Sequence, residues 1–260
     1  ACEMHPDGPI LLIDADMEII CNEDLCLQRP TNYYVAQKNG VLQYSNLRIV
    51  WPESKPVYHG RTHEFCAVEG SCCFMSMDVM FIKDNNDGGS KSDKFVRDIR
   101  LLSQDLEENP ASSRSLFYLA QSYRDLGEHE LALEKYQEYN LRFADTWDEE
   151  RFFAMYMIGK LERCLGRYNC ALRDLMIAYQ QRPHRQEPLR DLSEMCRENS
   201  QYELAVMFAE EGLKTCKKRN DDVLFVENIL ETDYKYELSI CLYYIEDSRK
   251  RGFYISDELL

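Results

Sequence analysis

Long hydrophobic runs and an excess of basic side chains are both missing from this 260-residue chain. No apolar run approaches the roughly 20 residues that a helix needs to cross a bilayer, so we expect no membrane span. Lysine and arginine number 31 against 46 aspartates and glutamates, which gives a net charge of −15. A general nucleic-acid binder needs a basic face to displace counterions from phosphates, so this charge argues against that class.

The common nucleotide and metal fingerprints are also missing. The sequence contains no G-x-x-x-x-G-K-[ST], no G-x-G-x-x-G and no H-E-x-x-H. Its 11 cysteines form no C-x-x-C pair, and no histidine lies at zinc-finger spacing from them. We therefore interpret the cysteines as small buried apolar residues in a reducing, cytoplasmic compartment, with a zinc site assembled from distant cysteines as the alternative.

The composition indicates a folded chain. Apolar residues make up 45% and charged residues 30%, and the length is ample for a buried core. The chain starts without methionine and ends at Glu258-Leu259-Leu260, within an apparent helix. We therefore expect a fragment of a longer protein.

The pattern changes character near residue 93. Before it, short runs rich in aromatic and β-branched residues predict strands at 10–13, 33–37, 47–51 and 73–82. The first of these is apolar throughout and indicates a strand buried on both faces. From Lys94 onward the apolar spacing is helical. We predict an α+β, mostly α chain with domains at 1–93 and 94–260.

The helical part contains an internal repeat. The segments 120–127 and 159–166 align, with small residues at Ala120 and Gly159 and turn glycines at Gly127 and Gly166, 39 residues apart. A third, weaker unit places Ser200 in the turn position. Helix pairs of this kind stack to bury their apolar faces, and the spacing is close to the roughly 34 residues of a tetratricopeptide repeat (TPR). A generic helical bundle is the alternative. The first helices carry a mixed surface without an evident carboxylate clamp: Tyr123, Arg124, Glu162 and Arg163.

Two carboxylates follow the first predicted strand in a D-x-D pattern. Asp14 and Asp16 come directly after the apolar run 10–13. Side chains two residues apart can point into one cleft, where carboxylate oxygens can hold a divalent cation. The alternative is a solvated acidic turn.

Two further patterns carry chemistry. His63 and Glu64 are candidates for a metal ligand and for a general base or acid. The run Asp87-Gly88-Gly89-Ser90-Lys91 can wrap an anion with its backbone N–H groups. The alternatives are ordinary polar surface residues for the pair and a flexible interdomain linker for the run.

Together these motifs resemble a known family. In order they are Leu12-Ile13-Asp14-Ala15-Asp16-Met17, Tyr44-Ser45-Asn46-Leu47-Arg48, His63-Glu64-Phe65, Asp87 to Phe95, Arg97-Asp98-Ile99 and Phe117 to Tyr123. They are similar to those of family 2 glycosyltransferases in which TPR-like repeats follow a catalytic domain of the nucleotide-sugar-binding GT-A type. The resemblance covers nearly the whole chain, and its most specific part runs from Asp87 to Tyr123.

The resemblance implies a partial α/β, GT-A-like portion, lacking the strands that bind the nucleoside, followed by helical repeats. Asp14 and Asp16 would hold Mn²⁺ or Mg²⁺ against the diphosphate of a nucleotide sugar, with His63 as a further ligand. Glu64, or His63, would deprotonate an acceptor hydroxyl.

Other parts of the chain also gain roles from the resemblance. Asp87, Gly88 and Gly89 would close over the donor. The acceptor would be a glycan, lipid or protein, and the repeats would bind a protein partner. The competing hypothesis is a non-catalytic TPR adaptor.

Overall fold

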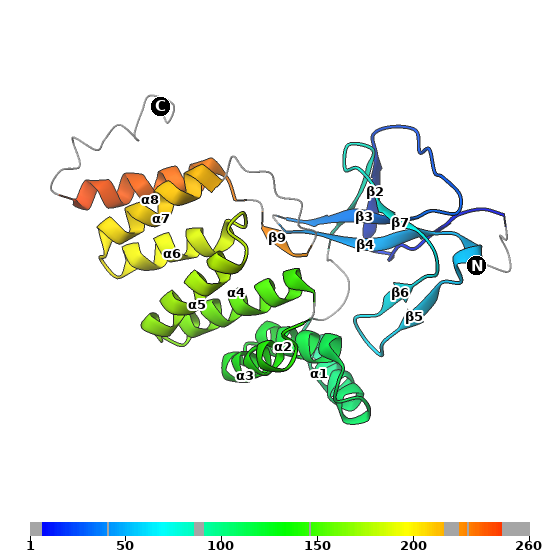
Figure 1. The fold of residues 1–260 in the computed structure, drawn as a ribbon, viewed down its shortest axis with the longest axis horizontal. Helices are drawn as coiled ribbons and strands as arrows, with labels where there is room; N and C mark the ends of the chain where they lie inside the picture. Colours follow the sequence, from blue (N-terminus) through cyan, green and yellow to red (C-terminus); the bar gives the residue numbers. More distant parts are fainter. Residues whose placement is uncertain are drawn as a thin grey trace. The chain divides into compact units, whose positions relative to one another are not determined.

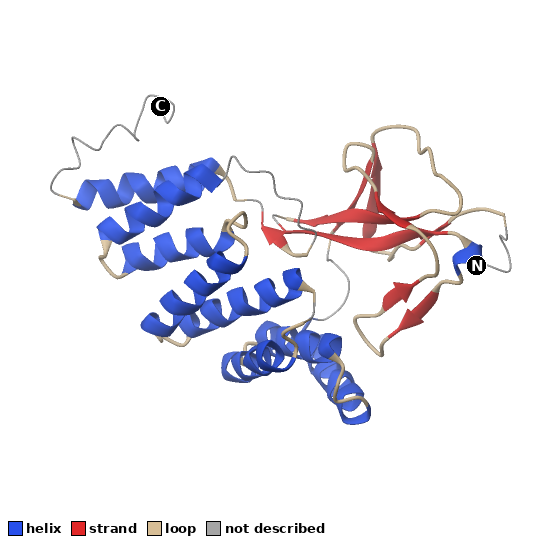
Figure 2. Cartoon of the chain, viewed as in Figure 1, coloured by secondary structure: helices blue, strands red, loops and turns tan. Residues whose placement is uncertain are grey.

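The chain folds into two compact units in the computed structural model (Figure 1). The structure describes residues 7–40, 42–85, 91–145, 147–215, 224–227 and 229–245, with side chains for all of these except 91–93. The first unit comprises residues 1–126 and 223–226, and the second comprises 127–222 and 227–260. The change from strands to helices lies at Lys91, beside the predicted boundary, whereas the compact units divide after Leu126 (Figure 2).

The first unit contains a mixed sheet in which β1, β4, β3, β8 and β2 lie side by side in that order, and β7 also pairs with β3. β3 runs parallel to β7 and β8, and the other neighbours are antiparallel. A second, two-stranded sheet pairs β5 with β6. The strands are Ile10–Leu11 (β1), Met17–Cys21 (β2), Asn32–Asn39 (β3), Leu42–Val50 (β4), Val57–His59 (β5), Phe65–Ala67 (β6), Cys72–Phe74 (β7), Met80–Asp84 (β8) and Val226–Glu227 (β9).

The α+β class is confirmed, but residues 7–85 do not show the α/β, GT-A-like portion that the resemblance implies. In the described part of this range the only helical segment is the short turn Pro52–Ser54. Parallel neighbours need a long crossover, usually a helix, whereas antiparallel neighbours can be joined by a tight turn. β3 and β4, which follow each other in the chain, are such an antiparallel pair, and Gly40 directly after β3 has φ 58°.

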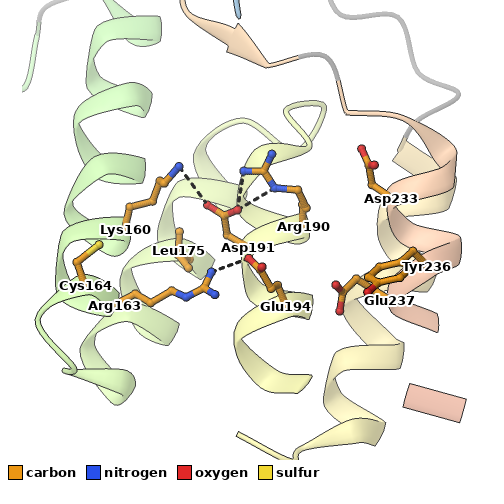
Figure 3. Close-up of a pocket in the computed structure, with 10 residues that line it drawn as sticks. All are labelled: Lys160, Arg163, Cys164, Leu175, Arg190, Asp191, Glu194, Asp233, Tyr236 and Glu237. Atoms are coloured by element: carbon orange, nitrogen blue, oxygen red, sulfur yellow. Dashed lines mark hydrogen bonds and ion pairs between the residues drawn. The ribbon is translucent and has the colours of Figure 1, made fainter. Parts of the chain in front are cut away.

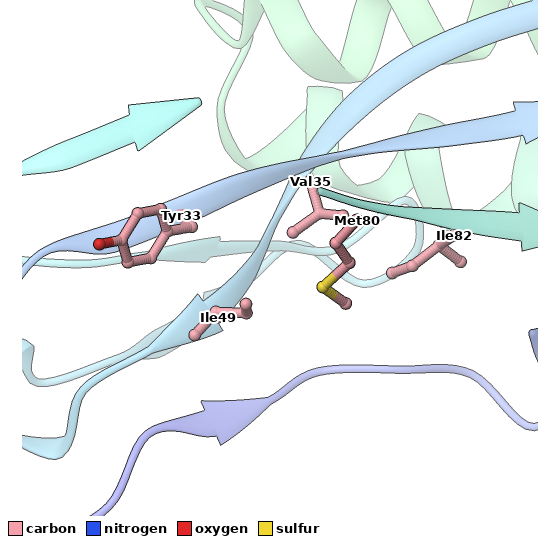
Figure 4. Packing of buried hydrophobic residues seen from close by; sticks show 5 residues of the cluster. All are labelled: Tyr33, Val35, Ile49, Met80 and Ile82. Atoms are coloured by element: carbon pink, nitrogen blue, oxygen red, sulfur yellow. The ribbon is translucent and has the colours of Figure 1, made fainter. Parts of the chain in front are cut away.

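Alternating strand positions form the core of the sheet. Tyr33 and Val35 of β3, Ile49 of β4, and Met80 and Ile82 of β8 are all buried and pack into one cluster (Figure 4). Successive side chains of a strand point to opposite faces, so positions two apart on β3 and on β8 share one face.

The prediction that 10–13 form a strand buried on both faces is wrong. β1 has two residues and pairs with β4 at the edge of the sheet, and Leu11 and Ile13 are 37% and 39% exposed. The predicted strand at 73–82 is two strands, because the chain turns at Ser76, whose carbonyl accepts the Val79 N–H.

Eight helices follow among the described residues, and none is long and apolar enough to span a membrane. The first unit contains Lys91–Glu108 (α1) and Ser113–Leu126 (α2), which pack together. The second unit contains His129–Arg142 (α3), Asp148–Cys164 (α4), Tyr168–Gln181 (α5), Glu187–Glu198 (α6), Tyr202–Thr215 (α7) and Glu231–Tyr244 (α8). Within it α4 packs on α5, α6 on α7, and α7 on α8, so the unit is a stack of helical hairpins.

The predicted turn positions are confirmed. Gly127, Gly166 and Ser200 all have positive φ, at 86°, 72° and 59°. Residues with positive φ commonly end helices, because they let the chain reverse while the last carbonyls are satisfied. The spacing from Gly166 to Ser200 is 34 residues, so the repeat shortens after its first period.

Small residues let paired helices approach closely, as predicted for Gly159. A Cβ atom at Gly159 would lie 2.7 Å from the Leu175 side chain and 3.0 Å from its backbone nitrogen. Gly212 also lets α7 and α8 approach closely, since a Cβ there would lie 2.2 Å from the Tyr234 ring on α8. The hairpins are therefore packed through glycine contacts as well as apolar side chains.

Candidate functional site

A buried polar network crosses one face of the sheet in the first unit. The Gln37 side chain is fully buried, and its Oε1 accepts hydrogen bonds from Asn46 Nδ2 and Arg48 Nε, both at 2.9 Å. Its Nε2 donates to Tyr44 Oη at 3.4 Å, and that hydroxyl donates to Asp84 Oδ2 at 2.6 Å. Burial and the Asp84 carboxylate raise the pKa of Tyr44. No pattern in the sequence marks Gln37 as the centre of this network.

Arg48 connects the network to the predicted D-x-D pair. Its guanidinium donates to the Leu12 carbonyl at 3.1 Å and to Asp14 Oδ2 at 3.3 Å. Asp14 and Asp16 lie in the turn between β1 and β2, closed by a hydrogen bond from Met17 N to the Asp14 carbonyl. The Asp14 side chain is 63% exposed, so one carboxylate is held in place by an arginine and remains open to solvent.

Asp14 and Asp16 are carboxylates, the residue type that a magnesium site uses. Mg²⁺ is commonly bound by one or two carboxylates together with substrate phosphates and water. Within the described ranges no three His, Cys, Asp or Glu side chains gather to hold a metal ion. Asp14, Asp16 and His63 are therefore not brought together as one ligand set.

His63 lies in the β5–β6 loop and points toward the helices of the first unit. Its ring stacks on Tyr118 of α2 with 4.3 Å between centroids, and its Nε2 is 3.8 Å from Asp98 Oδ2 on α1. Thr62 donates to the other Asp98 oxygen at 2.8 Å, and Arg114 donates to the His63 carbonyl at 3.0 Å. Burial lowers the pKa of His63, partly opposed by the charge of Asp98.

Glu64, the predicted base, is exposed next to His63. Burial, and then the charges of Cys66, Asp14 and Glu64, raise the pKa of the Tyr58 hydroxyl on β5. Asp87, Gly88 and Gly89 lie outside the described residues.

The predicted burial of the cysteines is correct only in part. Cys196 and Cys241 are fully buried in the helical unit. Cys164, also expected to be buried, is exposed. Four cysteines of the first unit are exposed as well: Cys21, Cys26, Cys72 and Cys73.

The second unit contains a groove of about 710 Å³ (Figure 3). Most of its lining comes from the first helices of successive hairpins and from α8. The lining residues are Lys160, Arg163 and Cys164 of α4, Leu175 of α5, Arg190, Asp191 and Glu194 of α6, and Asp233, Tyr236 and Glu237 of α8. Of the residues that the sequence placed on first helices, Arg163 lines this groove. Glu162 is buried instead, with Arg167 3.4 Å from its carboxylate.

The floor of the groove is a charged network. The buried Asp191 carboxylate accepts from the Tyr156 hydroxyl at 2.7 Å and from the Arg190 guanidinium at 2.6 and 2.9 Å. Arg190 also donates to Glu227 at 2.6 Å. Lys160 lies 3.9 Å from both Asp191 and Glu227, with its ammonium over the Tyr156 ring. Such a network fixes the side chains that a ligand would meet.

Comparison with known proteins gave no family assignment. No family model matches the chain, and no curated protein matches it. Among solved structures it is similar to MamA from Desulfovibrio magneticus RS-1, with TM-score 0.48 and 13% identity over 64% of this chain and 92% of that one. A tetratricopeptide repeat protein from Parabacteroides merdae gives TM-score 0.46 and 18% identity over 63% and 59% of the two chains. YrrB, described as a TPR protein with an unusual peptide-binding site, gives 0.47 and 12% over 62% and 74%. All three TM-scores are below 0.5, too low to carry an inference about this chain beyond the helical hairpins described above.

Proposed function

We propose that the helical unit is a protein-interaction module that binds an extended segment of a partner protein. The observation that supports this is the groove, which runs across α4, α6 and α8 and has a preorganised charged floor. Tyr236 is 62% exposed at its wall. Exposed tyrosines supply large, rigid contact area and are enriched in protein interfaces.

Peptide panning tests this function directly. A library of random peptides is selected on the purified chain, and the selected peptides are measured by calorimetry. We expect Tyr236→Ala to weaken their binding. Tyr243→Ala is the matched control, because Tyr243 is 77% exposed on the same helix and is not among the groove residues. Equal effects of the two substitutions would place binding outside the groove.

A second candidate function is metal-dependent transfer of a sugar from a nucleotide sugar. It is supported by the accessible Asp14 in the turn between β1 and β2, held by Arg48, with Asp16 two residues later. A divalent cation there would neutralise charge on the departing diphosphate. Glu64 is the proposed base for the acceptor hydroxyl, because it is an exposed carboxylate in the β5–β6 loop.

Calorimetry with UDP- and GDP-sugars in the presence of Mn²⁺ tests this candidate, on this chain and on a version extended upstream. We expect binding that the double substitution Asp14→Asn and Asp16→Asn abolishes. Glu18→Gln, a nearby exposed carboxylate on β2, is the control and should leave binding unchanged. Absence of nucleotide-sugar binding by the extended protein would exclude this function.

A further inference from the structure

We infer that the groove selects a basic segment, one whose lysine or arginine side chains meet Glu194 and Asp233; this inference rests on the proposed interaction function. The groove lining contains both signs of charge, so its selectivity depends on which charges are already satisfied by the protein. Within the described residues, the charged groups of the groove differ in how far their ion-pair and hydrogen-bond partners satisfy them.

The two arginines of the groove are already paired with carboxylates. Arg163 donates to Glu194 at 2.8 Å and to Glu198 at 2.6 Å. Arg190 is held by Asp191 and Glu227, as described above. An acidic ligand would have to displace these carboxylates or lie beside them, and like charges brought together across an interface are strongly unfavourable.

The carboxylates at the groove wall, in contrast, keep unused acceptor capacity. Each carboxylate has two oxygens and about four lone-pair sites. Glu194 accepts from Arg163 through Oε2, and Asp233 accepts from the Leu230 N–H through Oδ2. Within the described part of the chain the second oxygen of each accepts no hydrogen bond. Glu194 is 39% exposed and Asp233 is exposed, so both can receive a cation from solution.

Lys160 and Tyr236 complement such a segment. Lys160 is 38% exposed, and its two ion pairs at 3.9 Å are beyond hydrogen-bond distance, so its N–H groups can reach a peptide carbonyl. The exposed Tyr236 ring can stack on an arginine guanidinium. The groove thus offers a hydrogen-bond donor to the backbone of the segment. To its basic side chains the groove offers carboxylate acceptors and an aromatic face.

The charge of the whole unit favours the same ligand. Residues 127–222 and 227–260 contain 27 Asp and Glu against 19 Lys and Arg, a net charge of −8. A field of this sign raises the rate at which a cationic segment meets the groove and lowers that of an anionic one, and salt weakens both effects.

Three synthetic peptides of equal length and spacing test the inference, with arginine, glutamine or glutamate at the variable positions. We expect the arginine peptide to bind about tenfold tighter than the glutamine peptide, since a hydrogen bond to a charged group contributes that much. The advantage should shrink as NaCl is added. The glutamate peptide should bind most weakly.

Isosteric substitutions then locate the effect. Glu194→Gln with Asp233→Asn keeps the shape of the groove and should remove most of the arginine preference. Glu203→Gln, an exposed carboxylate on the second helix α7, should leave it unchanged.

The outcomes separate the two proposals. If panned peptides bind in a Tyr236-dependent way but the glutamine or glutamate peptide equals the arginine peptide, the basic preference is wrong and the interaction function stands. The preference is also wrong if Glu203→Gln has the same effect as the groove pair. If no peptide binds at all, the interaction function itself fails.

Discussion

Ser200 has the same left-handed backbone conformation as Gly166 and makes the same pair of helix-ending hydrogen bonds. The Gly166 N–H donates to the Arg163 carbonyl, and the next N–H donates to the carbonyl of Glu162. The Ser200 N–H donates to the Arg197 carbonyl, and the next donates to that of Cys196. The two hairpin turns therefore have the same structure, with glycine in one and serine in the other.

Ser200→Gly is expected to stabilise the helical unit by about 0.5–1 kcal/mol, because a side chain in this conformation is strained and glycine is not. The reverse change, Gly166→Ser, should destabilise it by a similar amount. Urea unfolding followed by circular dichroism measures both. Stabilisation by Gly166→Ser would contradict the structural equivalence of the two turns.

Gly159→Ala is expected to destabilise the α4–α5 hairpin by about 1–3 kcal/mol, since overpacking of a close contact costs that much. The added methyl group meets the Leu175 side chain at 2.7 Å. In an exposed helix position the same change would be favourable by about 1 kcal/mol, so the sign of the effect reports the contact. A double-mutant cycle with Leu175→Ala checks it, and a coupling energy near zero would show that the two residues do not interact.

Arg185→Met is expected to cost about 3–5 kcal/mol, because it removes the cation from a buried ion pair. Arg185 and Glu187 are 0% and 1% exposed, with Nη2 and Oε1 2.6 Å apart, and the guanidinium lies over the Phe152 ring. Adding Glu187→Gln should recover part of the loss, since the buried Glu187 charge that Arg185 neutralised is then removed as well. Thermal unfolding of the single and double variants measures this difference.

The stability of the first unit should fall with decreasing pH in a way that depends on His63. Its folded-state pKa is below the ordinary value of 6.5, so the unfolded chain takes up the proton first. The contribution of neutral His63 to the stability of the first unit is complete above about pH 7.5. It is lost as the pH falls through 6.5 toward the folded-state pKa of His63. The charges of Asp98 and Asp125 oppose this lowering of the His63 pKa, and those of Lys94 and Arg114 add to it.

His63→Asn provides the comparison, because asparagine tolerates the positive φ of 47° at this position and does not titrate. Trp51 is 7% exposed in the first unit and reports its unfolding by fluorescence when Trp147 is replaced by phenylalanine. Parallel stability curves for the two proteins from about pH 7.5 to 5.5 would show that His63 does not contribute.

The repeat could be predicted from the sequence because its determinants are local. A turn needs a residue that accepts positive φ, and two closely packed helices need a small residue. Gly127, Gly159 and Gly166 can therefore each be recognised from their own position in the sequence. Strand β2, with the mixed sequence Met17 to Cys21, has no regular alternation and was not predicted.

The sites could be predicted only where they are local. The turn that holds Asp14 and Asp16 follows a recognisable apolar run. The contact of His63 with Asp98 joins residues 35 positions apart, and the groove joins Lys160, Arg190 and Tyr236 from three helices. Such contacts depend on how the helices pack, which periodicity alone does not determine.

Residues 223–226 belong to the first unit, although most of the second unit precedes them in the chain. The Phe225 ring lies 6.0 Å from the Tyr44 ring of β4. Because the ribosome makes a chain from its N-terminus and domains fold as they emerge, the first unit is completed only after helices α3 to α7 have been synthesised. A chain that ends before this segment therefore lacks the Phe225 ring beside Tyr44 in its first unit.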